Sequence, residues 1–333
     1  MLRTALTAQL GIEYPILSAG IGTAAAPELV AAVSNAGGLG VLGTASLSAR
    51  YVRQLIERTR SLTNRSFGVN VVVPLLRRGQ IEVCFEERIP LLILFWGDPS
   101  PYVQAARSAG TKLFVQVGSV AEAISAAEAG VDGIIAQGVE AGGHVRGSTA
   151  LSVLLPAVVD AVSPLPVVAA GGIADGRGLL AALALGAQAV SIGTRFLASV
   201  EANASPEYKA RVVAANAADT VYTELFDGGW KAPHRVLRNG AVRAWESANR
   251  PPSGQRPSEG LTLGTMQSGG TSVEVSAYSA YLPESEVAAN VDEMALYAGQ
   301  CCELIRDVRP AADIVRAIVS QAREVLNRID TTP

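Results

Sequence analysis

The sequence has little charge, few aromatic side chains and almost no cysteine or histidine. Charged residues make up 17% of its 333 positions and the net charge is −3, so no strongly basic surface favours nucleic acid as a partner. The three cysteines, Cys84 and the pair Cys301-Cys302, form neither a metal-ligand spacing nor a disulfide framework. The composition therefore predicts a protein of a reducing compartment, without a metal site or a nucleic-acid partner.

Long apolar runs are missing as well. No apolar run reaches the roughly 18 residues that a membrane-spanning helix requires. The N-terminal segment, MLRTALTAQLGIEYP, lacks the apolar core of a signal peptide. We therefore expect a cytoplasmic protein that neither crosses nor binds a membrane.

Small aliphatic residues and glycine form a repeated pattern between Pro15 and Ser199. Each unit has a short apolar run, a turn with Gly or Asn, and an alanine-rich stretch with helical spacing. The apolar runs predict strands at Ile16–Ile21, Leu39–Gly43, Phe67–Val73, Leu91–Phe95, Leu113–Val117, Gly133–Ala136, Val167–Ala170 and Ala189–Gly193. The stretches between them predict helices that include Pro27–Ala36, Ala49–Arg60, Tyr102–Ser108, Val120–Ala129, Leu151–Ala161 and Gly178–Leu185.

Eight strands that alternate with helices predict an α/β fold, a (β/α)₈ TIM barrel. Low charge and small aliphatic residues suit parallel strands that are buried on both faces. A doubly wound open sheet is the alternative, because periodicity does not distinguish the two closures. We assign the barrel to residues 1–200, a smaller inserted substrate or lid domain to 201–287, and C-terminal helices that pack back on the barrel to 288–333.

The composition changes beyond Ser199, where Asn, Arg, Pro and Ser become more frequent. Residues 250–260 are typical of a flexible connection. His234 stands in a basic segment, Lys231–Arg243, which we expect to be a solvated loop, with an anion-guiding role as the alternative. A helical pattern returns from Val287 to about Arg328, and it contains Cys301-Cys302, which we expect to be packing residues.

Two glycine-rich loops follow the last two predicted strands of the barrel. Gly171 and Gly172 come after the first of these strands, and Gly193 and Thr194 come after the second. In barrels, these two positions often bind a phosphate group through backbone N–H groups and a helix N-terminus. The loops therefore predict a phosphate-binding site, with simple tight turns as the alternative.

Polar residues gather in the stretch Ala136–Gly147, AQGVEAGGHVRG, which follows a predicted strand. His144 lies there among glycines and is a candidate general base, since an imidazole titrates near neutral pH; a loop histidine that only forms hydrogen bonds is the alternative. Asn70 and Gln137 are amides at the ends of apolar strands. Each is a candidate ligand contact or, alternatively, a structural brace for a neighbouring loop.

Taken together, seven motifs resemble those of the nitronate monooxygenase family, the 2-nitropropane dioxygenase-like flavoproteins. In chain order they are PILSAGIG, NAGGLGVLG, FGVNVVVP, AQGVEAGGH, VVAAGGIADGRG, ALGAQAVSIGTRFLAS and LYAGQ. The resemblance covers nearly the whole chain and is weaker over residues 200–290. One difference stands out: Ala19-Gly20-Ile21 replaces the Ala-Pro-Met turn that the family usually has after its first strand.

The resemblance implies a TIM barrel that binds FMN non-covalently, and it identifies His144 with the family's catalytic histidine. The residues that it places at the cofactor are Asn70, Gln137, Gly142, Gly172, Ser191, Ile192, Gly193 and Thr194. Gly171 joins them as a candidate from the phosphate loop.

The resemblance also implies an enzyme that oxidises alkyl nitronates, and nitroalkanes after loss of a proton, with O₂ to a carbonyl compound and nitrite. An NAD(P)H-dependent flavin reductase of the enoyl-acyl-carrier-protein reductase or quinone reductase type is the alternative, because those relatives share the AGGH and GGIADGRG motifs. In that case Lys231–Arg243 would serve NADPH or a phosphopantetheine arm. A flavin-free barrel lyase or isomerase is a third hypothesis. The helical exterior of a barrel would also support a homodimer.

Overall fold

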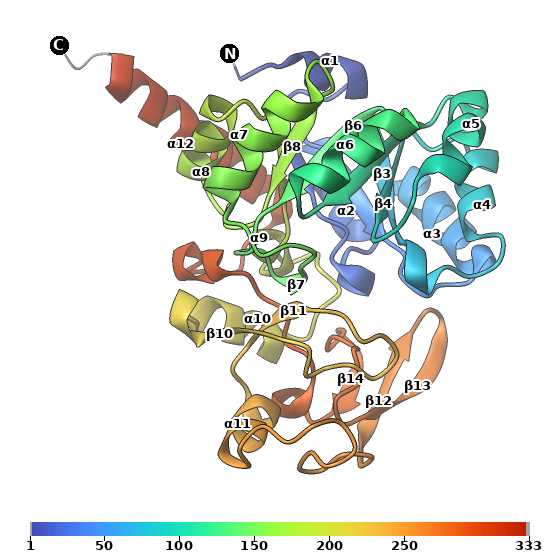
Figure 1. Cartoon of the computed structure of the whole chain (residues 1–333), viewed down its shortest axis with the longest axis vertical. Helices are drawn as coiled ribbons and strands as arrows, with labels where there is room; N and C mark the ends of the chain where they lie inside the picture. The colour runs from blue at the N-terminus through green and yellow to red at the C-terminus, as the bar shows by residue number, and fades with distance from the viewer. Residues whose placement is uncertain (1, 331–333) are drawn as a thin grey trace.

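The computed structural model describes residues 2–330 and has two parts, a barrel and a smaller region at one end of it (Figure 1). The barrel strands are β1 (Ile16–Ser18), β2 (Gly40–Gly43), β3 (Phe67–Val72), β4 (Leu91–Phe95), β5 (Lys112–Val117), β6 (Gly133–Gln137), β8 (Val167–Ala170) and β9 (Ala189–Ile192). Its helices are α1 (Ala5–Leu10), α2 (Pro27–Asn35), α3 (Ala49–Leu62), α4 (Gln80–Glu86), α5 (Ser100–Ala109), α6 (Val120–Ala129), α7 (Leu151–Val162), α8 (Gly176–Ala184) and α9 (Thr194–Leu197).

The eight parallel strands close into a barrel. Their order is β1-β9-β8-β6-β5-β4-β3-β2, and the two outer strands meet through Leu39. The Ser18 N–H donates to the Leu39 carbonyl at 3.0 Å, and the Leu39 N–H donates to the Ile16 carbonyl at 2.9 Å. The predicted (β/α)₈ barrel is therefore confirmed, and the open sheet is wrong.

Alternate residues of each strand face the inside of the barrel or the helices around it. Leu91 and Ile93 of β4 belong to an interior apolar cluster, whereas Leu92 and Leu94 pack toward the helices. Phe114 fills the space beside Gly133, where a methyl group would lie 2.4 Å from the Phe114 ring. Both faces of the strands are mostly apolar and buried, and Lys112, a charged strand residue, is exposed at the start of β5, away from the C-terminal ends of the strands.

A second region, residues 200–304, lies across one end of the barrel, and we call it the cap region (Figure 1). It contains α10 (Pro206–Ala214), β10 (Thr220–Thr223), β11 (His234–Leu237), α11 (Gly240–Ser247), β12 (Thr262–Ser268), β13 (Thr271–Ser276) and β14 (Val287–Ala289). One of its two antiparallel sheets, β10-β11-β7, takes β7 (Gly143–His144) from the loop after β6. A barrel loop and the cap region thus share one sheet. The lid role predicted for residues 201–287 stays a prediction.

The helix predicted from Val287 to Arg328 is wrong over its first half. Val287–Ala289 form β14, and the segment that follows runs extended beside β11, where the Leu237 N–H donates to the Leu296 carbonyl at 2.8 Å. The regular helix α12 begins only at Ala311 and packs on α8 and α2. The chain crosses back from the cap region here, and pairing with a strand edge satisfies its backbone better than a helix would. Cys301 and Cys302 are buried in a 3₁₀ turn among apolar residues, so their packing role is confirmed.

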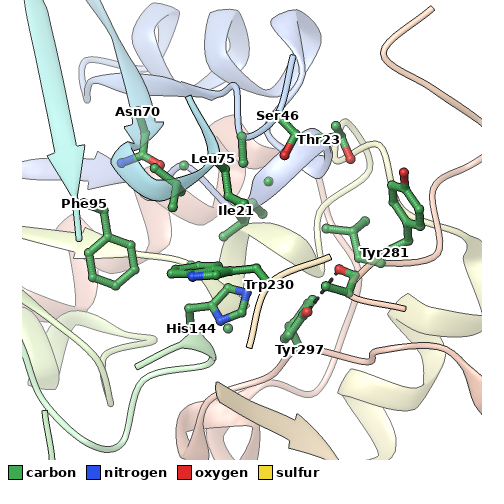
Figure 2. A pocket seen from close by; sticks show the side chains of 18 of the residues that line it. Ile21, Thr23, Ser46, Asn70, Leu75, Phe95, His144, Trp230, Tyr281 and Tyr297 are labelled. Atoms are coloured by element: carbon green, nitrogen blue, oxygen red, sulfur yellow. Dashed lines mark hydrogen bonds between the residues drawn. The ribbon is translucent and has the colours of Figure 1, made fainter. Parts of the chain in front are cut away.

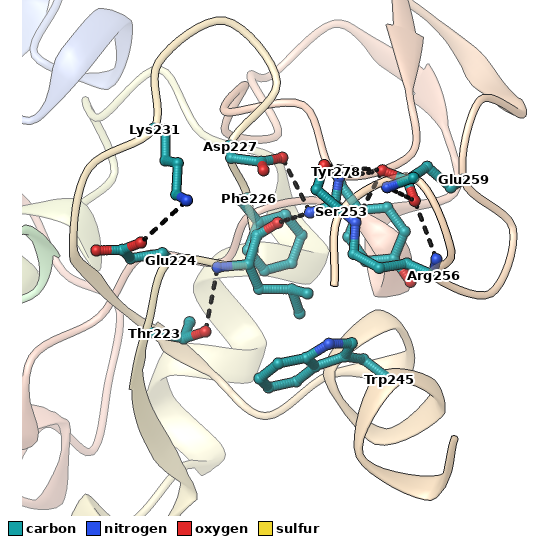
Figure 3. A network of polar contacts seen from close by, with 12 residues as sticks. Thr223, Glu224, Phe226, Asp227, Lys231, Trp245, Ser253, Arg256, Glu259 and Tyr278 are labelled. Atoms are coloured by element: carbon teal, nitrogen blue, oxygen red, sulfur yellow. Dashed lines mark hydrogen bonds and ion pairs between the residues drawn. The ribbon is translucent and has the colours of Figure 1, made fainter. Parts of the chain in front are cut away.

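The loop at residues 250–260, expected to be a flexible connection, is held by Arg256. Its side chain is 6% exposed and forms ion pairs with Asp227, at 2.9 Å, and with Glu259 (Figure 3).

Within residues 2–330, no helix has the length and apolar character to cross a bilayer.

Candidate active site

A cavity of about 1050 Å³ lies between the C-terminal ends of the barrel strands and the cap region. That volume is at the upper end of the roughly 300–1000 Å³ of small-molecule sites, so it suits a cofactor and a substrate together. Besides His144, its ionisable lining residues are the exposed Arg77, Glu274 and Tyr281, the half-buried Tyr297, and the buried Tyr208 and Cys301. The interior therefore carries no side chain that is charged at neutral pH, and an anion bound there would depend on neutral hydrogen-bond donors.

The loops after β8 and β9 supply such donors. Gly171 and Gly172 adopt φ values of +99° and +72°, which L-residues rarely adopt. Gly193 precedes the short helix α9, whose N-terminus no side chain caps. Ser191 lines the same part of the cavity and is buried. The hydroxyl of Thr194 accepts the Gly299 N–H at 3.0 Å, so it is fixed in place and still has its own proton to donate.

Asn70 and Gly20 are packed directly against one another at the mouth of the barrel. The Asn70 side chain lies beside the cavity (Figure 2), and its Nδ2 donates a long 3.4 Å hydrogen bond to the Ile93 carbonyl. A methyl group at Gly20 would lie 2.4 Å from Asn70 Cβ. This contact explains a glycine in the turn after β1, and it leaves Ile21 as an apolar lining residue.

Gln137 uses both ends of its amide to hold the loop that carries His144. Its Nε2 donates to the His144 carbonyl at 2.9 Å, and its Oε1 accepts the Arg146 N–H at 3.1 Å. Gly142 lies against the chain at Gly299, where a methyl group would be 2.3 Å from the backbone nitrogen. These two residues have a bracing role in this structure, and their contact with a cofactor stays a prediction.

His144 lies at the side of the cavity, on β7, under the indole of Trp230 (Figure 2). Its Nδ1 is buried and has no hydrogen-bond partner among residues 2–330, so Nε2 is the nitrogen left to meet a ligand. Burial, assisted by the nearby His234, lowers the pKa of His144 from about 6.5 to about 3. The imidazole is therefore unprotonated at physiological pH in this structure, and an anion bound beside it would raise its pKa back toward the range that suits a general base.

The expectation that His234 lies in a solvated basic loop is wrong. Its side chain is fully buried on β11, opposite His144 in the antiparallel pair. Nδ1 donates to the Ala232 carbonyl at 2.9 Å, and Nε2 accepts the Phe226 N–H at 3.2 Å. Burial lowers the pKa of His234, in agreement with a neutral ring that needs a lone pair on Nε2.

The basic segment around His234 has little free charge to guide an anion. Lys231 lies 3.9 Å from Glu224, Arg238 pairs with Glu246, and Arg243 pairs with Asp292. Arg235 is buried and donates to the Val139 carbonyl at 2.9 Å. The three ion pairs remain at the surface, and each cation has an acidic side chain beside it.

The sequence alone did not identify two tryptophans near His144. Trp230 stacks on its ring at a centroid distance of 4.3 Å, and Trp96 meets Trp230 edge-on at 4.9 Å. The only signal was that tryptophan is rare in this chain, with three in 333 residues. Tyr281 also lines the cavity, whereas Tyr278 is buried beneath Arg256.

Comparisons with known proteins show the family to which the chain is related. The family model described as nitronate monooxygenase matches residues 3–82 and 76–321. The (3aS,4S,5R,7aS)-5-hydroxy-7a-methyl-1-oxo-octahydro-1H-indene-4-carboxyl-CoA dehydrogenase of Rhodococcus jostii is 33% identical over 99% of this chain and 97% of its own. FabK from Thermotoga maritima superposes with a TM-score of 0.81 at 33% identity, over 99% of both chains. Nitroalkane oxidase from Streptomyces ansochromogenes superposes with a TM-score of 0.78 at 29% identity, over 98% of this chain and 100% of its own.

The chain belongs to the nitronate monooxygenase family, and it is a flavin-dependent oxidoreductase with the TIM-barrel fold.

Proposed function

We propose that this member of the nitronate monooxygenase family oxidises alkyl nitronates, and their parent nitroalkanes, with FMN as cofactor and O₂ as electron acceptor. The observation that carries the proposal is geometric: the His144 imidazole lines a cavity whose described interior has no charged side chain. A nitroalkane is a neutral carbon acid, so its oxidation requires a base of this kind. The nitroalkane oxidase among the structural neighbours supports the same substrate class.

The residues of the cavity fit FMN. The positive-φ glycines Gly171 and Gly172, with Gly193, would hold its phosphate through backbone N–H groups, and Ser191 and Thr194 would add hydroxyls. A ring system would lie over the strand ends beside Asn70, Ala19 and Gly20. When bound, FMN supplies the redox chemistry, taking electrons from the substrate and passing them to O₂.

The protein's own contribution is to move a proton and to exclude water. His144 Nε2 removes the proton from the α-carbon of a nitroalkane, and the imidazolium then neutralises the charge of the nitronate beside it. The apolar walls keep bulk water from the anion and strengthen this attraction. Gln137 and Arg235 keep the loop in place by binding its backbone, since Arg235 holds the Val139 carbonyl.

An anaerobic absorbance titration tests the proposal. The protein is loaded with FMN and mixed either with ethylnitronate or with NADH or NADPH. We expect the flavin absorbance to fall with ethylnitronate and to remain unchanged with nicotinamide. Loss of absorbance with nicotinamide alone would contradict the proposal.

NAD(P)H-dependent reduction is the second candidate. One observation favours it: FabK from Thermotoga maritima, an enoyl-acyl-carrier-protein reductase, superposes over 99% of both chains. The paired state of the basic side chains in Lys231–Arg243 argues against that segment as a docking site for NADPH or a phosphopantetheine arm. The nicotinamide arm of the titration decides between the two candidates.

A further inference from the structure

Trp230 covers one face of the imidazole that the mechanism uses. Its ring centroid lies 4.3 Å from that of His144, with the two planes inclined by 48°. It lines the cavity from the cap region, opposite the strand ends (Figure 2). A substrate that approaches His144 Nε2 therefore shares its space with this indole.

Trp96 supports Trp230 from the barrel side. The two indoles meet edge-on at 4.9 Å, a favoured aromatic geometry. Trp96 itself has a φ of +66°, a backbone conformation that is costly for a bulky residue and persists only where its surroundings fix it. Phe95 packs against it at 4.9 Å, and the guanidinium of Arg146 lies 5.0 Å from its ring. Trp96 is thus a rigid wall rather than a mobile side chain.

The loop that carries Trp230, residues 224–233, is fixed on both sides of its tip. Before the tip, the Phe226 N–H donates to His234, and Asp227 forms an ion pair with the buried Arg256 (Figure 3). Gly228 is hydrogen-bonded to the backbone at Tyr278 and Ala280.

The tip itself is built differently from its two sides. Gly229 has a φ of +102°, and nothing lies within 4 Å of the space that a side chain would take there. Hydrogen bonds resume beyond Trp230, where the Ala232 carbonyl accepts from His234. Gly229, next to Trp230, is therefore the residue of this loop that its surroundings restrain least.

We propose that Trp230 is the specificity-determining residue of this active site: its indole, held against Trp96, limits the size of the substrate that reaches His144. The choice of nitronates as test substrates rests on the proposed function. The contact by which Trp230 covers His144 does not depend on it. Small nitronates fit beside the indole, and bulky ones require it to leave.

The first test compares substrates of different size. The wild type, Trp230→Phe and Trp230→Ala are assayed with the nitronates of nitroethane and nitrocyclohexane. A difference of even one methylene in an apolar pocket changes kcat/KM by about 10–200-fold. We therefore expect Trp230→Ala to raise the cyclohexyl-to-ethyl ratio of kcat/KM at least about tenfold, with Trp230→Phe in between. Trp245→Phe is the matched control, because Trp245 lies outside the cavity lining and donates to the Pro251 carbonyl.

The second test does not depend on activity. Diethylpyrocarbonate acylates accessible neutral imidazoles, and the chain has only two histidines. His234 is buried with both ring nitrogens hydrogen-bonded, so the reaction, followed at about 240 nm, reports on His144; His144→Asn confirms the assignment. We expect the acylation rate of the FMN-loaded protein to rise severalfold in Trp230→Ala and to stay unchanged in Trp245→Phe.

The two readouts separate failure of this proposal from failure of the proposed function. An unchanged substrate ratio and an unchanged acylation rate in both Trp230 variants would overturn the role of Trp230. A faster acylation with no oxidation of any nitronate, even by the wild type, would keep the covering role and overturn the proposed function. Trp230→Phe retains most of the ring contact, so the tests remain informative if Trp230→Ala does not fold.

Discussion

The barrel and the cap region line the same cavity with different kinds of chemical group. On the barrel side, glycine loops such as that of Gly172 bring backbone amides to the lining, beside side chains such as Asn70. On the cap side, aromatic side chains, among them Trp230 and Tyr297, line the cavity. The barrel therefore suits a constant ligand, the cofactor, whereas the cap region suits recognition of a variable one.

The two parts also differ in how they use charge. The barrel ion pair of Arg58 with Glu28 is exposed on the outer helices, with the Arg58 side chain 56% exposed. The cap region buries Arg256 among acidic partners and over the ring of Tyr278, at 4.3 Å. Side-chain hydrogen bonds from Arg256 lower the pKa of Glu259 to about 2. The cap region thus combines apolar clusters of its own with a buried set of ion pairs around Arg256.

The largest effect is expected at the residue where the two parts meet. Replacing His144 by Asn removes the base on β7 and should lower kcat/KM for nitroethane by about 10²–10⁴-fold, the usual contribution of general acid–base catalysis. A preformed ethylnitronate has already lost its proton and should lose far less. Steady-state oxygen consumption with both substrates measures the difference. Equal losses would mean that His144 is not the base.

Next in size is the loss of the buried arginine of the cap region. Arg256→Ala leaves Asp227 and Glu259 without their partner, and we expect unfolding in urea to require about 3–5 kcal/mol less. Arg58→Ala breaks an exposed barrel pair, and we expect a change of about 0–1 kcal/mol. Similar losses in both variants would show that the two parts use charge in the same way.

The pH dependence of stability reports on the two histidines between the barrel and the cap region. The folded state lowers the pKa of both, whereas in the unfolded chain they titrate near 6.5. Between pH 6 and 5 the unfolded chain therefore binds protons that the native protein does not, and stability falls as the pH falls. The slope from His144 should approach about 1.4 kcal/mol per pH unit, and His234 adds a contribution of the same sign. Urea unfolding of the wild type, His144→Asn and His234→Asn measures it, and each single variant should have a smaller slope than the wild type.

The smallest effect is expected in the glycine loop of the barrel. Gly172→Ala places a methyl group on a residue with φ of +72°, which costs roughly 1–2 kcal/mol. If the residue relaxes, its N–H turns away from the phosphate, and FMN should bind about tenfold more weakly. Gly254→Ala is the matched control in the cap region, with φ of +90° and open space around it. Flavin fluorescence titration should show no change for the control; equal weakening in both would remove Gly172 from the phosphate site.

Prediction from the sequence succeeded where one local pattern corresponds to one structure. All eight barrel strands appear within a few residues of the apolar runs that predicted them, because a run of small aliphatic residues between glycine turns has few other folds available. The short helix α4 went unpredicted. Prediction failed over residues 287–310, where part of a segment with helical spacing pairs as an extended chain with β11. Periodicity records which residues are buried, and does not record the partner that buries them.

The sequence by itself determined the barrel, the glycine loops and the position of His144 between them, because each follows from residues that are neighbours in the chain. Only the tertiary structure decided the environment of that histidine. Trp96 follows a barrel strand, whereas Trp230 and His234 come from one stretch of the cap region, and their contacts with His144 depend on that region folding across the strand ends. Burial lowers the pKa of His144, and the contact with Trp230 covers one face of its ring. Both effects require that distant parts of the chain have been brought together.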